Sequence, residues 1–347
     1  MSKRIGMVTL GNNVPSTRFR FLPYLPLLRA RGHACRMWTS YPSVYDSIPQ
    51  LGWRISTSVK RMTRWCQWTD ARWFRPDVIY LERGCYHDTS LTMDRRFRRA
   101  TPRLVLDVDD AIFLQFPDKV RQLIEMSDHI VVSNRPLRDY AAQFHDCITE
   151  VPTCVPLSKF TLRNYESVPT GKPVVGWIGT SSNLGFLSTC AGALRRVAAE
   201  VPFTLLVVSN DATPLRSIDL HGVDVRFEPW SAETEVGFLH QMDIGLMPLP
   251  NDQEWMKYKA ATKLVQYMSV GIPAIASPVG VNRDILEAEQ VGFSATTEQE
   301  WIDALRELLR NEPLRRSMGS EGRKRVESKY CIESNVERLE NALIGIR

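Results

Sequence analysis

The stretch AATKLVQYMSVGIPAIASPVGVN, residues 260–282, decides the fold of this chain. Apolar residues at three- and four-residue spacing predict a helix over its first part, and Gly271 ends that helix. The apolar run 274–277 predicts a short buried parallel strand, and the glycine-containing loop 278–282 leads into the next helix. This order is typical of open α/β sheets, whose ligands bind outside the carboxyl ends of the strands.

Two lysines, Lys259 and Lys263, lie four residues apart at the start of the predicted helix. If the helix runs through both, their like charges share one face, which costs roughly a few tenths of a kcal/mol. An anion between them would remove that cost, and a diphosphate beside a helix N-terminus is such an anion. The alternative interpretation is a pair of solvated lysines.

The segment KLVQYMSVGIPAIASPVGVN resembles the donor-binding segment of glycosyltransferase family 4 and the related group 1 glycosyltransferases. The pattern of that family is roughly K-L-x-E-Y-M-A-x-G-x-P-V-[IV]-A-[ST], followed by a loop that contains glycine. The resemblance implies an α/β fold of the GT-B kind, in which two Rossmann-like domains with doubly wound parallel sheets face a cleft. It also implies that the two lysines contact the diphosphate of a nucleotide sugar.

The length of the chain predicts two domains, because 347 residues exceed the size at which a single core usually stops growing. We expect an N-terminal acceptor-side domain over 1–155 and a linker over 156–172. A donor-binding domain should span 173–330, with 331–347 forming a helix that crosses back to the first domain. The seven cysteines show no CxxC pair, which favours reduced thiols in a cytoplasmic protein over disulfides or zinc.

Charge is distributed unevenly along the chain. Residues 1–150 contain 23 Lys and Arg against 15 Asp and Glu, a net charge of +8, whereas residues 151–347 have a net charge of −3. This asymmetry predicts an anionic partner for the N-terminal half, such as a phosphate-bearing acceptor, a membrane surface or nucleic acid. No segment resembles a nucleic-acid module, so we expect no nucleic-acid partner.

Segment 53–75 concentrates this charge, with four tryptophans and six Lys or Arg against one Asp. A basic helix with aromatic residues can lie on an anionic bilayer. The resemblance implies such membrane binding, because several GT-B enzymes that act on lipid-linked acceptors bind the membrane through their N-terminal domain. The alternative is an amphipathic helix that packs on the sheet and turns its arginines outward. No apolar run approaches the roughly 18 residues of a membrane-spanning helix.

The N-terminal domain opens with a predicted strand over 4–10, a turn, and a predicted helix from an N-cap at Ser16 to Arg31. The helix start, PSTRFR, resembles a P-S-x-R-x-R stretch that faces the cleft in family 4 enzymes; the alternative is a pair of surface arginines. The residues that we expect to face the cleft and the acceptor are Asn12, Asn13, Arg18, Arg20, Arg83 and Asp107.

The segment LVLDVDDAIF predicts a buried strand over 104–108, with Asp109 and Asp110 at its carboxyl end. Three carboxylates in four residues repel one another, so either one has a raised pKa or all face arginines or water. In the family this strand often ends in His-Asp, with Asp109 at the His position and Asp110 at the Asp position. The resemblance therefore implies a catalytic set of Asp109, Asp110 and Lys263.

The same aspartates leave other interpretations open. An Asp-x-Asp can hold a divalent cation in glycosyltransferases of the other main fold, and it opens a class of phosphatases in which the first Asp is the nucleophile. A structural capping cluster is a further alternative. We expect neither a metal site nor a cofactor, with the nucleotide-diphosphate sugar as a substrate.

The donor side follows from the same resemblance. Small residues after the strand 173–178 would let backbone N–H groups approach a phosphate. The two glutamates of the family's E-x7-E motif are replaced here by Tyr258 and Gln266. The residues that we expect to bind the donor are Lys259, Lys263, Gln266, Gly179, Thr180, Ser181, Trp230, Gly280, Val281 and Asn282.

Together these features predict a hexosyltransferase that moves a sugar from a nucleotide-diphosphate sugar to a hydroxyl on a glycan, polysaccharide or lipid-linked acceptor. The resemblance implies a retaining and metal-independent reaction, in the cytoplasm or at the inner face of the membrane. Two alternatives stay open. One is a GT-B sugar-nucleotide epimerase, and the other is a non-catalytic relative that binds sugar nucleotides or glycans, which the two missing glutamates favour.

Overall fold

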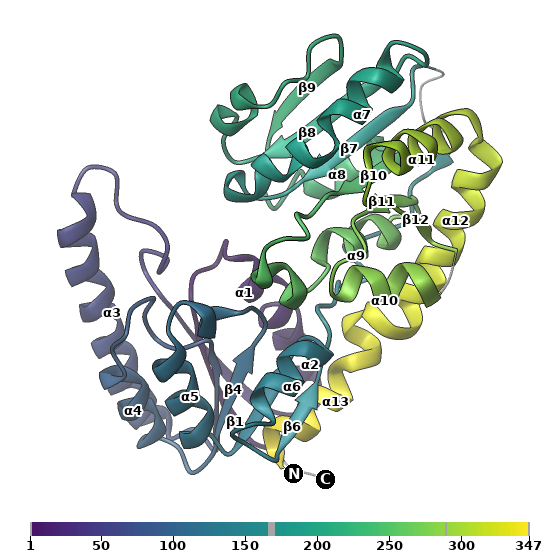
Figure 1. The fold of residues 1–347 in the computed structure, drawn as a ribbon. Helices are drawn as coiled ribbons and strands as arrows, with labels where there is room; N and C mark the ends of the chain where they lie inside the picture. The colour runs from purple at the N-terminus through teal and green to yellow at the C-terminus, as the bar shows by residue number, and fades with distance from the viewer. Residues whose placement is uncertain (1, 166–170, 289, 346–347) are drawn as a thin grey trace. The chain divides into compact units, whose positions relative to one another are not determined.

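The computed structural model describes residues 2–165, 171–288 and 290–345. The chain forms two compact units: unit 1 comprises Met1–Cys154 and Ile332–Arg347, and unit 2 comprises Val155–Cys331. The chain therefore leaves unit 1 once and returns to it at the end (Figure 1). Of the expected linker 156–172, residues 166–170 lie outside the described residues. Residues 156–165 belong to unit 2, where Arg163 is buried against Asp243.

Unit 1 is built on a sheet of six parallel strands in the order β2-β1-β3-β4-β5-β6. Strands β3 and β4 are buried along their whole length, as expected for a parallel sheet covered by helices on both faces. The strands are β1 (Arg4–Thr9), β2 (Ala34–Thr39), β3 (Val78–Glu82), β4 (Leu104–Val108), β5 (His129–Val132) and β6 (Ile148–Glu150).

Seven α-helices of the described chain belong to unit 1. They are α1 (Pro15–Arg20), α2 (Tyr24–Ala30), α3 (Gly52–Phe74), α4 (Thr92–Arg98), α5 (Pro117–Met126), α6 (Arg135–Ala141) and α13 (Ile332–Ile344). The single helix expected over 16–31 is wrong: it is two helices, and the first has Val14 rather than Ser16 at its N-cap. Pro23 lies at the break, where a proline cannot donate to the carbonyl one turn back.

The C-terminal helix α13 completes the core of unit 1. Its apolar side packs with β1 and β3 in one buried cluster that includes Ile5, Tyr80 and Leu339. The Arg103 guanidinium donates to the carbonyls of Leu343 and Ala342, both at 2.9 Å, which satisfies acceptors at the end of the helix.

Unit 2 repeats the architecture with a second sheet of six parallel strands, in the order β12-β11-β10-β7-β8-β9. The strands are β7 (Val174–Ile178), β8 (Thr204–Ser209), β9 (Asp224–Pro229), β10 (Ile244–Met247), β11 (Ala274–Ala276) and β12 (Gly292–Ser294). The α-helices are α7 (Ser188–Ala198), α8 (Glu235–Gln241), α9 (Thr262–Ser269), α10 (Val281–Ala288), α11 (Glu298–Arg310) and α12 (Glu312–Arg325). Two doubly wound parallel sheets are the predicted fold class, which is confirmed.

Each sheet has one point at which the strand order reverses. In unit 1 the reversal lies between β1 and β3, and in unit 2 it lies between β7 and β10. Loops leave such a pair of strands in opposite directions, so a crevice opens at their carboxyl ends, and ligands of open α/β sheets bind there. The two reversal points therefore define where candidate sites are expected.

Candidate functional site

Lys263 of α9 lies at the reversal point of unit 2. Its ammonium group is 5.2 Å from the centre of the Trp177 ring on β7. A Cβ atom added to Gly179, the residue that follows β7, would come within 2.6 Å of the Lys263 Cε and 3.1 Å of its Nζ. Lys263 therefore lies along the backbone of Gly179, where only a glycine leaves room for its side chain.

The charge of Lys263 is poorly compensated. Among the described residues, neither Lys259 nor Lys263 forms an ion pair. Burial, and then the neighbouring charge of Lys259, lower the pKa of Lys263 to about 7. A half-buried ammonium beside a second cation has unused hydrogen-bond donors, and a bound anion would satisfy them.

The two lysines reach this place by a different path from the one expected. Helix α9 begins at Thr262, and Ala261 before it has the left-handed φ of 53°, so Lys259 lies outside the helix. No single helix therefore runs through both lysines. The turn at Ala261 nevertheless leaves Lys259 close enough to act on the pKa of Lys263.

The loop after β11 approaches the same place. Gly280 has a left-handed φ of 54°, and a Cβ atom added to it would lie 2.4 Å from the Lys257 carbonyl oxygen. Any other residue at Gly280 would push this loop away from the segment that carries Lys259. Val281 then begins α10, so the helix N-terminus is placed next to that segment.

The loop after β7 is held by its own polar groups. Thr180 is the N-cap residue of a 3₁₀ helix over Ser181–Leu187, and its hydroxyl accepts from the Asn183 amide at 2.9 Å. The Ser181 N–H donates to the Asn210 side chain at 2.9 Å. This N–H is occupied by a side chain that a ligand would have to displace.

Of three further donor-side residues, two form side-chain hydrogen bonds within the protein and the third is buried. Asn282 is 1% exposed and its side-chain amide donates to the Ser277 carbonyl at 3.1 Å, so this side chain fixes the loop, and donor binding by Asn282 stays a prediction. The Trp230 indole N–H donates to Glu235 at 3.3 Å. Gln266 is buried on α9, three residues after Lys263.

At the reversal point of unit 1, Arg83 and Asp109 form a two-bond ion pair. The guanidinium donates from Nε and from Nη2 to the two carboxylate oxygens, at 2.5 and 2.9 Å. Arg83 immediately follows β3 and has a left-handed φ of 51°, an unfavourable conformation for a residue with a Cβ. Such local strain is typical of functional sites. The pair holds the pKa of Asp109 below its ordinary value.

Arg20 and Asp107 are buried in the interior of unit 1, which corrects the expectation that they face a cleft. The Arg20 guanidinium donates to both oxygens of Asp107 at 2.7 and 2.8 Å, and the Tyr80 hydroxyl donates to the same carboxylate at 2.6 Å. Burial raises the pKa of Asp107 against the effect of Arg20. Of the two alternatives stated for the clustered aspartates, both are seen: Asp107 has a raised pKa, and Asp107 and Asp109 each face an arginine.

A buried carboxylate that the sequence did not single out lies beside this pair. Glu82, the last residue of β3, is fully buried and accepts from the Leu10 N–H at 2.8 Å and the Thr17 hydroxyl at 2.6 Å. Burial raises the pKa of Glu82 to about 7. Through these hydrogen bonds Glu82 connects the loop after β1 and the helix α1 to the end of β3.

The remaining residues expected near the acceptor lie at the same edge of unit 1. Asn12 and Asn13 are exposed in the loop after β1, and Arg18 is half-buried on α1. The Asp110 carboxylate accepts from the next backbone N–H, that of Ala111, at 3.0 Å, so it begins the turn after β4. Asp110 also lies 3.9 Å from the Arg83 guanidinium.

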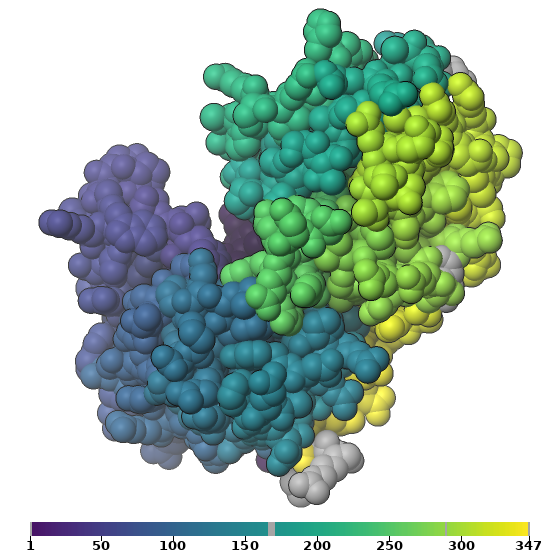
Figure 2. Space-filling view, in the orientation of Figure 1, coloured from purple at the N-terminus to yellow at the C-terminus, as the bar shows by residue number. Residues whose placement is uncertain are grey.

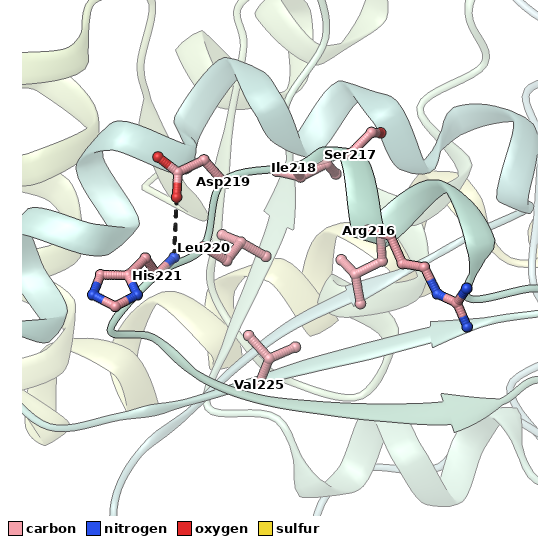
Figure 3. A pocket seen from close by; sticks show the side chains of 8 residues that line it. Arg216, Ser217, Ile218, Asp219, Leu220, His221 and Val225 are labelled. Carbon is pink, nitrogen blue, oxygen red and sulfur yellow. Dashed lines mark hydrogen bonds between the residues drawn. The ribbon is translucent and has the colours of Figure 1, made fainter.

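A hollow in unit 2 lies away from these residues. It has a volume of about 550 Å³ and is formed by the segment Leu215–His221 together with Val225 of the edge strand β9 (Figure 3). No residue expected in the site lines it. Across the described residues, no group of three or more His, Cys, Asp or Glu side chains is placed to hold a metal ion.

Comparisons with solved structures identify the fold. The chain matches sucrose-phosphate synthase from Thermosynechococcus elongatus with a TM-score of 0.72 and 14% identity, over 97% of this chain and 98% of the other. It matches a glycosyltransferase from Rickettsia africae with a TM-score of 0.68 and 11% identity, over 98% of each. The TM-score against WaaG, a glycosyltransferase involved in lipopolysaccharide biosynthesis, is 0.67 at 13% identity, over 98% and 100%. The fold is that of the GT-B glycosyltransferases.

The family model adds the activity class. Residues 172–311 match the glycosyl transferases group 1 family, and these residues include both lysines and the loops around them. Residues 172–311 therefore form a domain of the group 1 glycosyl transferase kind. No curated protein matches the chain.

Several residues that lie at the two candidate sites were not identified from the sequence. Trp177, Asn210 and Glu82 lie at or just beyond the carboxyl ends of β7, β8 and β3, a position that strand prediction alone could have flagged. Tyr45, whose hydroxyl accepts from Arg83 at 3.2 Å, comes from an irregular segment, and no local pattern indicates it.

Proposed function

We propose that this glycosyltransferase moves a hexose from a nucleotide-diphosphate sugar to a hydroxyl acceptor, with retention of anomeric configuration and without a metal ion. The observation that carries the proposal is the pair Lys259 and Lys263, two cations without an acidic partner among the described residues, at the reversal point of the group 1 domain. The match to a HepE structure in complex with UDP and glucose, at 12% identity, supports a uridine nucleotide as the first donor to test.

The chemistry assigned to the lysines is electrostatic. As the glycosidic bond breaks, negative charge develops on the leaving diphosphate, and preorganised cations stabilise that charge in a partly buried place. Lys263 would contact the diphosphate directly, with Lys259 beside it. In unit 1, Asp109, fixed by Arg83, would position the acceptor hydroxyl, and Asp110 would support the turn.

A thermal-shift screen of nucleotides and nucleotide sugars, with and without Mg²⁺, tests the donor. A nucleoside diphosphate at about 100 times its dissociation constant should add about 2.7 kcal/mol of stability. We expect stabilisation by diphosphates of one base and no dependence on Mg²⁺. No shift with any nucleotide would refute the donor assignment, and a shift that requires Mg²⁺ would refute metal independence.

Proton NMR of the transfer reaction tests the rest. Once the screen has named the donor, the anomeric configuration of the first-formed product shows retention or inversion directly. An epimerase would convert the donor without any acceptor, whereas a non-catalytic relative would bind the donor and leave it intact. Either result would replace the transferase proposal.

The second element of the proposal is a peripheral contact between unit 1 and an anionic membrane. Eight of the ten large hydrophobic side chains exposed in the described chain lie between Tyr41 and Trp73. Those of α3 include Met62 at 63% and Trp73 at 87% exposure. The exposed basic residues along the same helix are Arg54, Arg61, Arg72 and Arg75.

Three of the four buried residues of α3 are polar, Ser56, Lys60 and Arg64, and the fourth is Ala71, so the helix does not pack the apolar side on the sheet that the alternative expected. A helix of 23 residues spans about 35 Å, and its apolar outer side with flanking cations suits the plane of an anionic lipid surface. In the space-filling view α3 forms a projecting ridge of unit 1 (Figure 2). In the described part of the chain, no helix is long and apolar enough to cross a membrane.

Co-sedimentation with vesicles tests this contact. We expect binding to phosphatidylcholine vesicles that contain phosphatidylglycerol, weakened by salt, and no binding to phosphatidylcholine alone. The double variant Trp65→Ser/Trp73→Ser should weaken binding by about 1.5 kcal/mol or more for each side chain. Leu162→Ser, which removes an exposed side chain of unit 2, is the matched control. Equal binding by both variants would refute the assigned face.

A further inference from the structure

The buried side of α3 binds polypeptide backbone rather than apolar side chains. Lys60 donates to the Val44 carbonyl at 3.0 Å, Thr63 donates to the Tyr41 carbonyl at 3.1 Å, and the Ser56 hydroxyl accepts from the Ile48 N–H at 2.9 Å. All three partners lie in the irregular segment 40–51 that precedes α3. This segment therefore takes its position from polar side chains of the helix.

Arg64, on the same side of α3, binds backbone carbonyls at the ends of the strands. Its guanidinium is fully buried and donates to the carbonyls of Thr9 at 2.6 Å, Trp38 at 2.9 Å and Cys85 at 3.3 Å. These carbonyls lie at the carboxyl ends of β1 and β2 and in the turn after β3. A single side chain of α3 thus contacts both sides of the reversal point of unit 1 and the turn that contains Arg83.

Tyr45 connects the irregular segment to the ion pair. Its hydroxyl accepts from the Arg83 Nη1 at 3.2 Å, while Arg83 holds Asp109 through its two other bonds. The Tyr45 ring meets the His87 ring edge-on at 5.0 Å, and the His87 ring meets Phe116 at 5.2 Å. A contiguous set of contacts therefore runs from α3 through segment 40–51 and Tyr45 to Arg83 and Asp109.

We propose that α3 couples lipid binding to the acceptor side of the site: contact of its outer face with an anionic lipid surface fixes segment 40–51, and Tyr45 then fixes Arg83 and Asp109. Tyr45 is a positioning residue in this arrangement, because it acts on Asp109 through Arg83. The inference rests on the proposed membrane contact, and it adds a regulation of the proposed site. Such coupling requires a segment with two arrangements, whose equilibrium changes when lipid binds. Here that segment is 40–51, and the position of Arg83 and Asp109 depends on its arrangement.

Hydrogen–deuterium exchange of the full chain tests the coupling, with phosphatidylcholine/phosphatidylglycerol vesicles and without them. In the wild-type protein we expect vesicles to slow exchange in α3, in 40–51 and in the turn 82–86, the last by about tenfold, the factor for one net hydrogen bond. Protection confined to α3, or no binding to these vesicles, would overturn the proposal.

Two variants separate the steps. Tyr45→Phe keeps the ring and removes only the hydroxyl that accepts from Arg83, so vesicles should still protect α3 and 40–51 but no longer protect 82–86. Thr63→Val removes one bond between α3 and the segment and should reduce protection from 40–51 onward. Wild-type protection of 82–86 in Tyr45→Phe would overturn the assigned path.

Ser58→Ala, exposed on the same helix, is the matched control and should behave as the wild type. The measurement needs no donor sugar. A negative outcome is therefore distinguishable from a failure of the proposed glycosyl transfer, which the nucleotide screen reports.

Discussion

One titratable side chain at the reversal point of each unit, Glu82 in unit 1 and Lys263 in unit 2, has a pKa of about 7, and the two differ in the groups that surround their charge. Burial raises the pKa of Glu82 in unit 1 and lowers that of Lys263 in unit 2, in both cases to about 7. Glu82 accepts hydrogen bonds from Leu10 and Thr17 within its own unit. Lys263 has a tryptophan ring, a glycine backbone and a second lysine around it.

Glu82 accepts both of these bonds through one oxygen, Oε2, and its Oε1 is buried without a hydrogen-bond partner, whereas Lys263 has no acidic partner among the described residues. In unit 1 the other charges at the reversal point are paired, as Arg20 with Asp107 and Arg83 with Asp109. Each of these paired charges fixes the position of its partner. The Lys263 ammonium lies near the Trp177 ring, and a bound anion would stabilise its charge further, so unit 2 holds the stronger candidate for ligand binding.

The largest expected effect comes from breaking a pair in unit 1. Asp107→Ala leaves the buried Arg20 uncompensated and should destabilise the protein by about 3–5 kcal/mol. Urea unfolding followed by circular dichroism measures the loss, with Asp118→Ala on the exposed side of α5 as the control. A change below about 1 kcal/mol would contradict the importance of this pair.

The contribution of Glu82 to stability should depend on pH. Its pKa is higher in the folded than in the unfolded state, so the unfolded state loses the proton first and stability falls as the pH rises from 4.5 to about 7. Within this window the slope is about 1.4 kcal/mol per pH unit, relative to Glu82→Gln. The difference between the two proteins in urea unfolding at pH 5 and pH 8 measures it. Parallel stability curves would contradict the assignment.

Removing the cation of unit 2 should affect binding more than folding. Lys263→Ala should weaken the binding of a nucleoside diphosphate by about 1.5–3 kcal/mol, the range for a hydrogen bond to a charged group. Calorimetry measures the affinity, and Lys324→Ala on α12, where the ammonium pairs with Glu321, is the matched control. Unchanged affinity in Lys263→Ala would refute its phosphate role.

The smallest effect is the pH dependence of that affinity. In the free protein the pKa of Lys263 is about 7, and a bound diphosphate raises it, so binding takes up a proton above that pH. Affinity should be fully present below pH 7 and fall about tenfold per pH unit above it, until the pKa of the complex is reached. Calorimetry in buffers of different ionisation enthalpy measures the proton uptake. A flat profile between pH 6 and 8 would contradict it.

Most of the fold could be predicted from the sequence because its strands are short apolar runs followed by glycines or polar residues. The strand over 104–108 was predicted with the bounds that the structure has. The strands β6 and β12 were missed, since each has only three residues and a half-buried pattern. Such strands are stabilised by neighbours in the sheet, which a single sequence does not display.

The site was less predictable, because side-chain direction is a tertiary property. Arg20 and Asp107 belong to recognisable segments that are 87 residues apart in the sequence. Their side chains nevertheless form an ion pair in the interior of unit 1. Conversely, a shared helix was only one way to bring Lys259 and Lys263 together, and the structure does so through the left-handed turn at Ala261. Whether the lysines bind the donor stays a prediction.

The return of the chain to unit 1 has a consequence for synthesis on the ribosome. Unit 1 buries α13 against β1 and β3, with Arg103 bonded to the end of the helix, and this helix is made after the whole of unit 2. Residues 1–154 therefore emerge with an uncovered apolar surface and must wait while 177 further residues are translated. At about 5–20 residues per second this delay lasts roughly 10–35 seconds, a period in which the apolar surface of unit 1 that α13 covers stays exposed and unit 2 can fold first.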